Sequence, residues 1–147
     1  MKILSRVLFA SALAILSASL LAANVVGTWK GKITIDSSKA PKPANPEQQK
    51  AVENGLAQVK KMVLTLNLKA DKTYTVDASN VPGQTKNQKS EGTWKQDGNT
   101  VLLTEVKDNG KPTNDKQPKT LTILEGGKKL SLSAPGMPPF VKVTFTR

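Results

Sequence analysis

The chain has 147 residues, of which 37% are hydrophobic and 22% charged, and a formal net charge of +11 at pH 7. It contains neither cysteine nor histidine, which excludes disulfides, thiolate nucleophiles, His-containing triads and Cys/His metal sites. Catalysis would have to rest on carboxylates, Lys, Ser or Tyr, and the spacing forces no two carboxylates together. We therefore expect a non-enzymatic protein with no cofactor and no bound metal.

The first 23 residues have the features of an export signal. A basic start with Lys2 and Arg6 precedes an almost entirely apolar or small stretch at 7–21, which ends in Ala22-Ala23. A membrane anchor would need about 20 apolar residues, and serines interrupt this stretch. We predict a signal peptide at 1–23, cleaved after Ala23, and a periplasmic or secreted mature domain at 24–147. No cysteine follows the cut, so we expect no lipoprotein anchor.

The charge of the mature chain, near +9, favours an anionic partner. Its basic residues are lysines scattered along the chain, with Arg147 as the one arginine. Nucleic-acid recognition relies on arginine forks and stacked aromatic side chains, so we do not expect a nucleic-acid partner. The charge therefore leaves two interpretations, a solvated lysine surface or an anionic component of the cell envelope as the partner.

Alternation of apolar and polar residues predicts eight strands, in chain order at 25–36, 62–69, 73–76, 91–95, 100–104, 120–123, 130–133 and 141–146. One apolar face and one Thr, Lys or Ser face per strand is typical of an antiparallel sheet with one wet side. The phase is ambiguous only in the fifth run, where we expect Val101 and Leu103 to point inward. The polar outer face is unsuited to lipid, so we expect no membrane span in the mature form.

One helix is predicted between the first two strands, near residues 46–61. Asn45 is a good N-cap, Pro46 suits the first helical position, and Gln48 completes a capping box. Apolar residues then recur at helical spacing, at Val52, Leu56, Val59 and Val63. A Pro-, Lys- and Ser-rich linker at 36–43 precedes the helix.

The connections between strands alternate between tight and long. The tight ones, at 70–71, 96–99 and 125–127, include Asp-Gly and Gly-Gly, which favour hairpin turns. In a meander every second connection lies at the same end, so the tight turns gather at a sealed end and the long loops at a mouth. We therefore predict an all-β, eight-stranded antiparallel up-and-down barrel with the helix across the mouth, because closure removes the sheet edges. A two-sheet sandwich is the alternative.

Three residues are predicted to have structural roles. Trp29 and Trp94 lie in the inward phase of their strands, so we expect both side chains to be buried. Arg147 ends the last strand at the sealed end, where the first strand begins. If these two strands pair, Arg147 lies over the Trp29 ring in a cation–π contact.

From Val25 onward the chain resembles the lipocalins and related calycin-type barrels, and small secreted bacterial proteins of that type. Gly27-Thr28-Trp29 matches the Gly-x-Trp motif that opens the first strand of that family, and Arg147 matches an arginine that the family places over that Trp. The Thr-Asp-Tyr motif of lipocalins is missing, and Gly92-Thr93-Trp94 repeats the first motif in mid-chain. The helix is more similar to the lid of fatty-acid-binding proteins. The resemblance implies binding of a small apolar ligand.

Inward apolar residues near the mouth are the candidate ligand-binding residues: Ile35, Leu64, Val76, Leu103, Leu121, Leu132 and Val141. An eight-stranded barrel is either just filled by its side chains or just holds one ligand. The small number of aromatic residues leaves room for a ligand. The helix could instead fill the mouth with its apolar stripe, as part of the core, or close it as a hinged lid.

A cationic rim is the second hypothesis. Eight lysines are expected in loops at the mouth: Lys39, Lys42, Lys86, Lys89, Lys107, Lys111, Lys116 and Lys119. Such a rim would bind an anionic glycan or lipid headgroup, with an affinity that falls as the salt concentration rises. In this case the protein would be a structural or interaction protein of the cell envelope.

Overall fold

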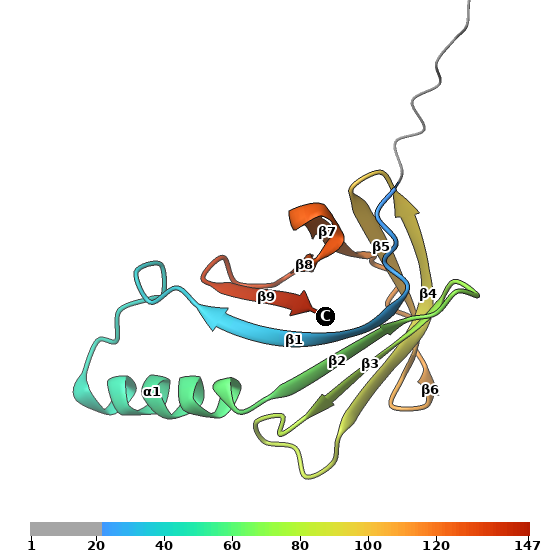
Figure 1. The fold of residues 1–147 in the computed structure, drawn as a ribbon. Coiled ribbons are helices and arrows are strands. Elements are labelled where there is room, and N and C mark those ends of the chain that lie inside the picture. The colour runs from blue at the N-terminus through green and yellow to red at the C-terminus, as the bar shows by residue number, and fades with distance from the viewer. Residues whose placement is uncertain (1–21) are drawn as a thin grey trace, which may run out of the picture.

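The computed structural model describes residues 22–147, so the signal peptide predicted at 1–23 lies almost wholly outside the described residues. Antiparallel strands form a closed barrel (Figure 1). The eight long strands are β1 (Gly27–Ile35), β2 (Val63–Leu68), β3 (Thr73–Ser79), β4 (Gln88–Asp97), β5 (Thr100–Asp108), β7 (Lys119–Leu124), β8 (Lys129–Ser133) and β9 (Val141–Thr146).

Two pairings close the barrel. The first strand, β1, pairs with both β2 and β9, and β4 pairs with β5, so each of the eight long strands has a neighbour on both sides. The predicted fold class is confirmed, and the sandwich alternative is wrong. A short ninth strand, β6 (Lys111–Pro112), pairs with the end of β5 inside the segment that we expected to be a loop.

The tight connections lie together at the sealed end. The main-chain N–H of Trp94 donates to the carbonyl of Lys72, and that of Ile123 donates to Asn99, which ties neighbouring turns together. Asp71 accepts hydrogen bonds from the main-chain N–H and the hydroxyl of Thr73, at 2.9 and 2.6 Å, and so fixes the β2–β3 turn. The longer connections lie at the opposite end of the barrel, the mouth.

The core is densest toward the sealed end. Trp29 is 0% and Trp94 4% exposed, as predicted. The two indoles have similar surroundings, because each donates to a main-chain carbonyl at 2.9 Å, Trp29 to Val25 and Trp94 to Lys69. Val101 and Leu103 point inward, which confirms the expected phase of β5. Burial decreases toward the mouth, where several inward side chains are only half-buried.

The helix α1 (Pro46–Lys60) forms as predicted but does not cover the mouth. The Asn45 side chain caps it by accepting from the N–H of Gln48 at 2.8 Å. No residue of α1 is fully buried, and Val52 is 42% exposed. Figure 1 shows α1 leading into the start of β2, beside the outer end of β1, instead of across the barrel.

The prediction that the helix lies across one end is therefore wrong, and the helix is neither a plug nor a lid in this structure. Only Lys61 and Met62 separate α1 from β2, so the direction of the strand determines where the helix lies. Little of the helix packs against the barrel, since only Leu56 and Val59 of its apolar stripe are even half-buried. No helix in residues 22–147 is both long and apolar enough to cross a membrane.

Candidate functional site

An apolar cavity of about 210 Å³ lies inside the barrel on the side of the mouth. Strands β2, β3, β4, β5, β7, β8 and β9 and the start of the β8–β9 loop all contribute to its wall. The lining residues are Leu64, Leu66, Tyr74, Val76, Ser90, Leu103, Lys119, Leu121, Leu132, Ala134 and Phe145. The barrel is therefore not completely filled by its own side chains.

Most of the candidate ligand-binding residues surround this one cavity: Leu64, Val76, Leu103, Leu121 and Leu132. The other two, Ile35 and Val141, pair with each other at the outer ends of β1 and β9 and do not line it. Ile35 borders a separate surface depression with Lys60 and Met62 instead. These two strands extend past the cavity, which periodicity alone cannot reveal.

Both aromatic residues of the cavity wall lie opposite a glycine on the neighbouring strand. Tyr74 pairs with Gly92, and Phe145 pairs with Gly31. A Cβ atom at Gly92 would come within 2.8 Å of Tyr74 Cε1, and one at Gly31 within 2.8 Å of Phe145 Cε1. The rings therefore lie over strand positions without a side chain, in a cavity whose other apolar lining residues are aliphatic.

Polar groups that the sequence analysis did not include in the site meet at one side of the cavity. Ser90 on β4 donates to Glu105 Oε2 at 2.6 Å, and Lys119 on β7 forms an ion pair with the same oxygen. The Glu105 side chain is only 10% exposed. Ser90 lies outside the stretches of clear alternation, near the start of β4, so it was not predicted as a cavity residue, and Lys119 was predicted only as a lysine of the mouth rim.

The electrostatics of this cluster keep the carboxylate charged and the phenol neutral. Burial alone would raise the pKa of Glu105, but hydrogen bonds from Lys119 and Ser90 and the charge of Lys119 outweigh it, so the pKa of Glu105 falls below its usual value. Burial first, and the charge of Glu105 second, raise the pKa of Tyr74 to about 12. At neutral pH the Tyr74 hydroxyl is thus a hydrogen-bond donor.

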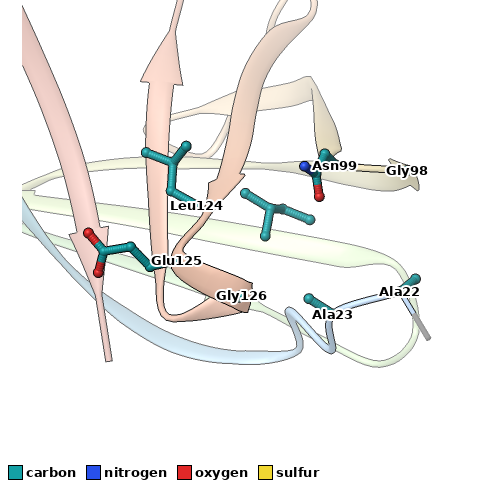
Figure 2. A pocket seen from close by; sticks show the side chains of 9 residues that line it. Ala22, Ala23, Gly98, Asn99, Leu124, Glu125 and Gly126 are labelled. Atoms are coloured by element: carbon teal, nitrogen blue, oxygen red, sulfur yellow. The ribbon is translucent and has the colours of Figure 1, made fainter. Parts of the chain in front are cut away.

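A larger depression of about 750 Å³ lies at the sealed end, against Ala22, Ala23, Asn99 and the segment 123–127 (Figure 2). Its wall consists mostly of main chain and small side chains. The carboxylate of Glu125 points away from Asn99 and Ala23 in Figure 2, and it pairs with Lys129 at 2.5 Å. Without convergent polar groups this depression is not a candidate site, despite its size.

Three of the eight lysines of the predicted rim are paired with carboxylates. Lys39 pairs with Asp36 at 3.3 Å, Lys89 pairs with Glu91 at 3.1 Å, and Lys119 pairs with Glu105. The hypothesis of an anionic partner stays a prediction without a specific structural observation in its favour. Residues 22–147 also contain no group of three or more carboxylates that could hold a metal ion.

The fold and the cavity define a small closed β-barrel domain with an internal apolar site. Residues 56–131, just over half of the 147-residue chain, match the family model of the NlpE N-terminal domain, and the chain belongs to this family. The family is one of β-barrel domains of envelope lipoproteins and is not known for catalysis, in agreement with an envelope-associated, non-enzymatic protein. No curated protein matches the chain.

The matched segment runs from the second half of α1 into β8. It includes the polar cluster and most of the cavity wall, whereas β1 and β9 lie outside it. The closed eight-stranded barrel is therefore confirmed and the family is that of the NlpE N-terminal domain, while the resemblance to lipocalins in particular stays a prediction.

Proposed function

We propose that this protein is an exported, lipocalin-like binding protein of the cell envelope that holds a small hydrophobic ligand in its barrel. The observation that carries the proposal is the apolar cavity of about 210 Å³ enclosed by the barrel strands. A cavity of about 150 Å³ lined by aliphatic side chains stays dry and binds benzene, so this one is large enough for a small apolar molecule. It is smaller than the pockets of about 300–1,000 Å³ that take drug-sized ligands.

The wall supports binding instead of catalysis. Its aliphatic side chains come from five strands and the start of the β8–β9 loop, and it offers only a few polar groups at one side. The carboxylate there, Glu105, is engaged by Lys119 and Ser90, which leaves it no free role as a general acid or base. Small-molecule sites have this composition, mostly apolar with few polar groups that fix orientation.

The test is a titration of isotope-labelled protein with toluene, followed by amide chemical shifts. Toluene is expected to shift the amides of Val76, Leu103 and Leu121. The variant Val76→Phe fills the cavity and should abolish the shifts. Val106→Phe is the matched control, because Val106 is 49% exposed on the outer face of β5 and its replacement leaves the cavity unchanged. Equal binding by the two variants would contradict the proposed function.

Native mass spectrometry of protein purified from its own host is the complementary measurement. A retained small apolar molecule in the wild type, absent from Val76→Phe, would identify the natural ligand.

A further inference from the structure

The Tyr74 hydroxyl is the polar group of the cavity that the fold leaves without a partner. Tyr74 is 1% exposed, and its side chain lines the cavity. Among the residues that the structure describes, no donor or acceptor is within hydrogen-bonding geometry of Tyr74 Oη. A buried hydroxyl without a partner is costly, by about the desolvation free energy of the group, so its presence calls for an explanation.

The neighbouring polar groups are already engaged with one another. The Ser90 hydroxyl is close enough to lower the pKa of Tyr74, but the two hydroxyls do not meet hydrogen-bond geometry, and Ser90 donates its own hydrogen to Glu105. Glu105 in turn pairs with Lys119, whose side chain is 31% exposed at the edge of the cavity. The cluster thus presents one unused donor, Tyr74 Oη, beside an ion pair whose two charges cancel.

We propose that the ligand is a short single-chain amphiphile with an uncharged, hydrogen-bond-accepting head, such as an alcohol, ester or ketone, and that Tyr74 donates to that head. This rests on the proposed function and specifies the ligand of the same cavity. The aliphatic wall takes the chain, and the Ser90, Glu105 and Lys119 cluster surrounds the head. At about 25 Å³ per carbon, the value for benzene in its cavity, 210 Å³ holds about eight heavy atoms.

The ion pair excludes charged heads of either sign. A carboxylate head would lie beside Glu105, which keeps its negative charge at neutral pH and already raises the pKa of Tyr74. An ammonium head would lie beside Lys119 and could not accept from Tyr74. Because the cavity is apolar elsewhere, a charged head would also lose its hydration without a free counter-ion.

Four probes that differ only in their heads test this selectivity: hexane, 1-hexanol, hexanoate and hexylammonium, titrated into the full folded protein and followed by amide chemical shifts. We expect 1-hexanol to bind, and both charged probes to bind at least about tenfold more weakly. The variant Tyr74→Phe should lower the affinity for 1-hexanol by about 3- to 10-fold, as one lost hydrogen bond does, and leave hexane unaffected.

The matched control for Tyr74→Phe is Thr75→Val, which removes a hydroxyl from the neighbouring position on the outer face of β3. This variant should change neither the affinity for 1-hexanol nor the affinity for hexane. If Tyr74→Phe also leaves 1-hexanol binding unchanged, then Ser90 satisfies Tyr74 within the protein and the proposed head contact is wrong.

Variants of the ion pair give a second test that does not depend on Tyr74. Glu105→Gln leaves Lys119 without its partner and should admit hexanoate, whereas Lys119→Met leaves Glu105 without its partner and should admit hexylammonium. We expect each gain to be about tenfold and specific to one probe. Lys129→Met, which breaks the exposed Glu125–Lys129 pair at the sealed end, is the control and should alter neither.

The outcomes separate the two proposals. Equal affinities for hexane, 1-hexanol, hexanoate and hexylammonium would overturn the head-group inference. They would still support the proposed binding of an apolar ligand in the cavity. If none of the four probes nor toluene binds, the proposed function fails with it. Tighter binding of hexanoate than of 1-hexanol by the wild type would contradict exclusion by the ion pair directly.

Discussion

The Tyr74 ring lies in the space that a side chain at position 92 would occupy, 2.8 Å from where a Cβ atom of residue 92 would be. Gly92 follows a shift in the register between β4 and β5, between Glu91 and Gly92, and its missing Cβ also faces the carbonyl of Thr104. Such irregularities often re-aim side chains next to functional sites. Here the missing side chain of Gly92 makes room for the Tyr74 ring in the cavity wall.

We predict that Gly92→Ala destabilises the protein by about 1–3 kcal/mol, because the added methyl group must displace Tyr74 or the main chain of β5. Gly55→Ala in the exposed helix is the matched control. A Cβ atom there meets nothing within 4 Å, so this variant should be about 0.5–1 kcal/mol more stable than the wild type. Urea unfolding checks both, and equal midpoints would contradict the account of Gly92.

Trp29→Ala should cost about 3–5 kcal/mol, because the indole is fully buried and its N–H hydrogen bond to Val25 is lost. Arg147→Met should cost only about 0.5–2 kcal/mol. It removes a guanidinium that lies 4.2 Å from the centroid of the Trp29 ring, the cation–π contact that the pairing of the first and last strands predicts. If urea unfolding shows that Arg147→Met loses more unfolding free energy than Trp29→Ala, the assigned contributions of the two side chains are wrong.

Deletion of residues 38–58, bridged by a short Gly/Ser linker, should leave a folded barrel. Only Leu56 in the deleted segment's apolar stripe is half-buried, and no residue of α1 is fully buried, so the loss should not exceed about 3 kcal/mol. Toluene should bind as it does to the wild type. Failure of the shortened chain to fold would show that the helix belongs to the core after all.

Stability should depend on the ionisation of Glu105. Its pKa in the folded state is lower than in the unfolded chain, so the carboxylate stabilises the fold fully above the unfolded value of about 4.5, and this contribution is lost as the pH falls through the folded-state pKa. Glu105→Gln should therefore weaken the acid dependence of the urea midpoint below pH 5. An acid dependence identical to that of the wild type would contradict this role.

The sequence was sufficient for the barrel because each strand alternates and each tight turn carries its own signal, as at Gly98 and at Gly126-Gly127. The cavity could be foreseen only in part. Leu103 and Leu121 follow from the alternation, whereas Ser90 near the start of β4 was not recognised and Lys119 was expected only in the lysine rim. The position of the helix could not be foreseen, since it depends on the direction in which α1 leaves β2 and not on its own pattern.

The most direct test of the account is the measurement of intermolecular nuclear Overhauser effects between toluene and the isotope-labelled protein. We predict contacts from the toluene protons to the methyl groups of Val76, Leu103 and Leu121, which line the cavity. Contacts confined to Val52 and Leu56 of the helix, or no intermolecular contacts at a toluene concentration that saturates the shifts, would contradict binding inside the barrel.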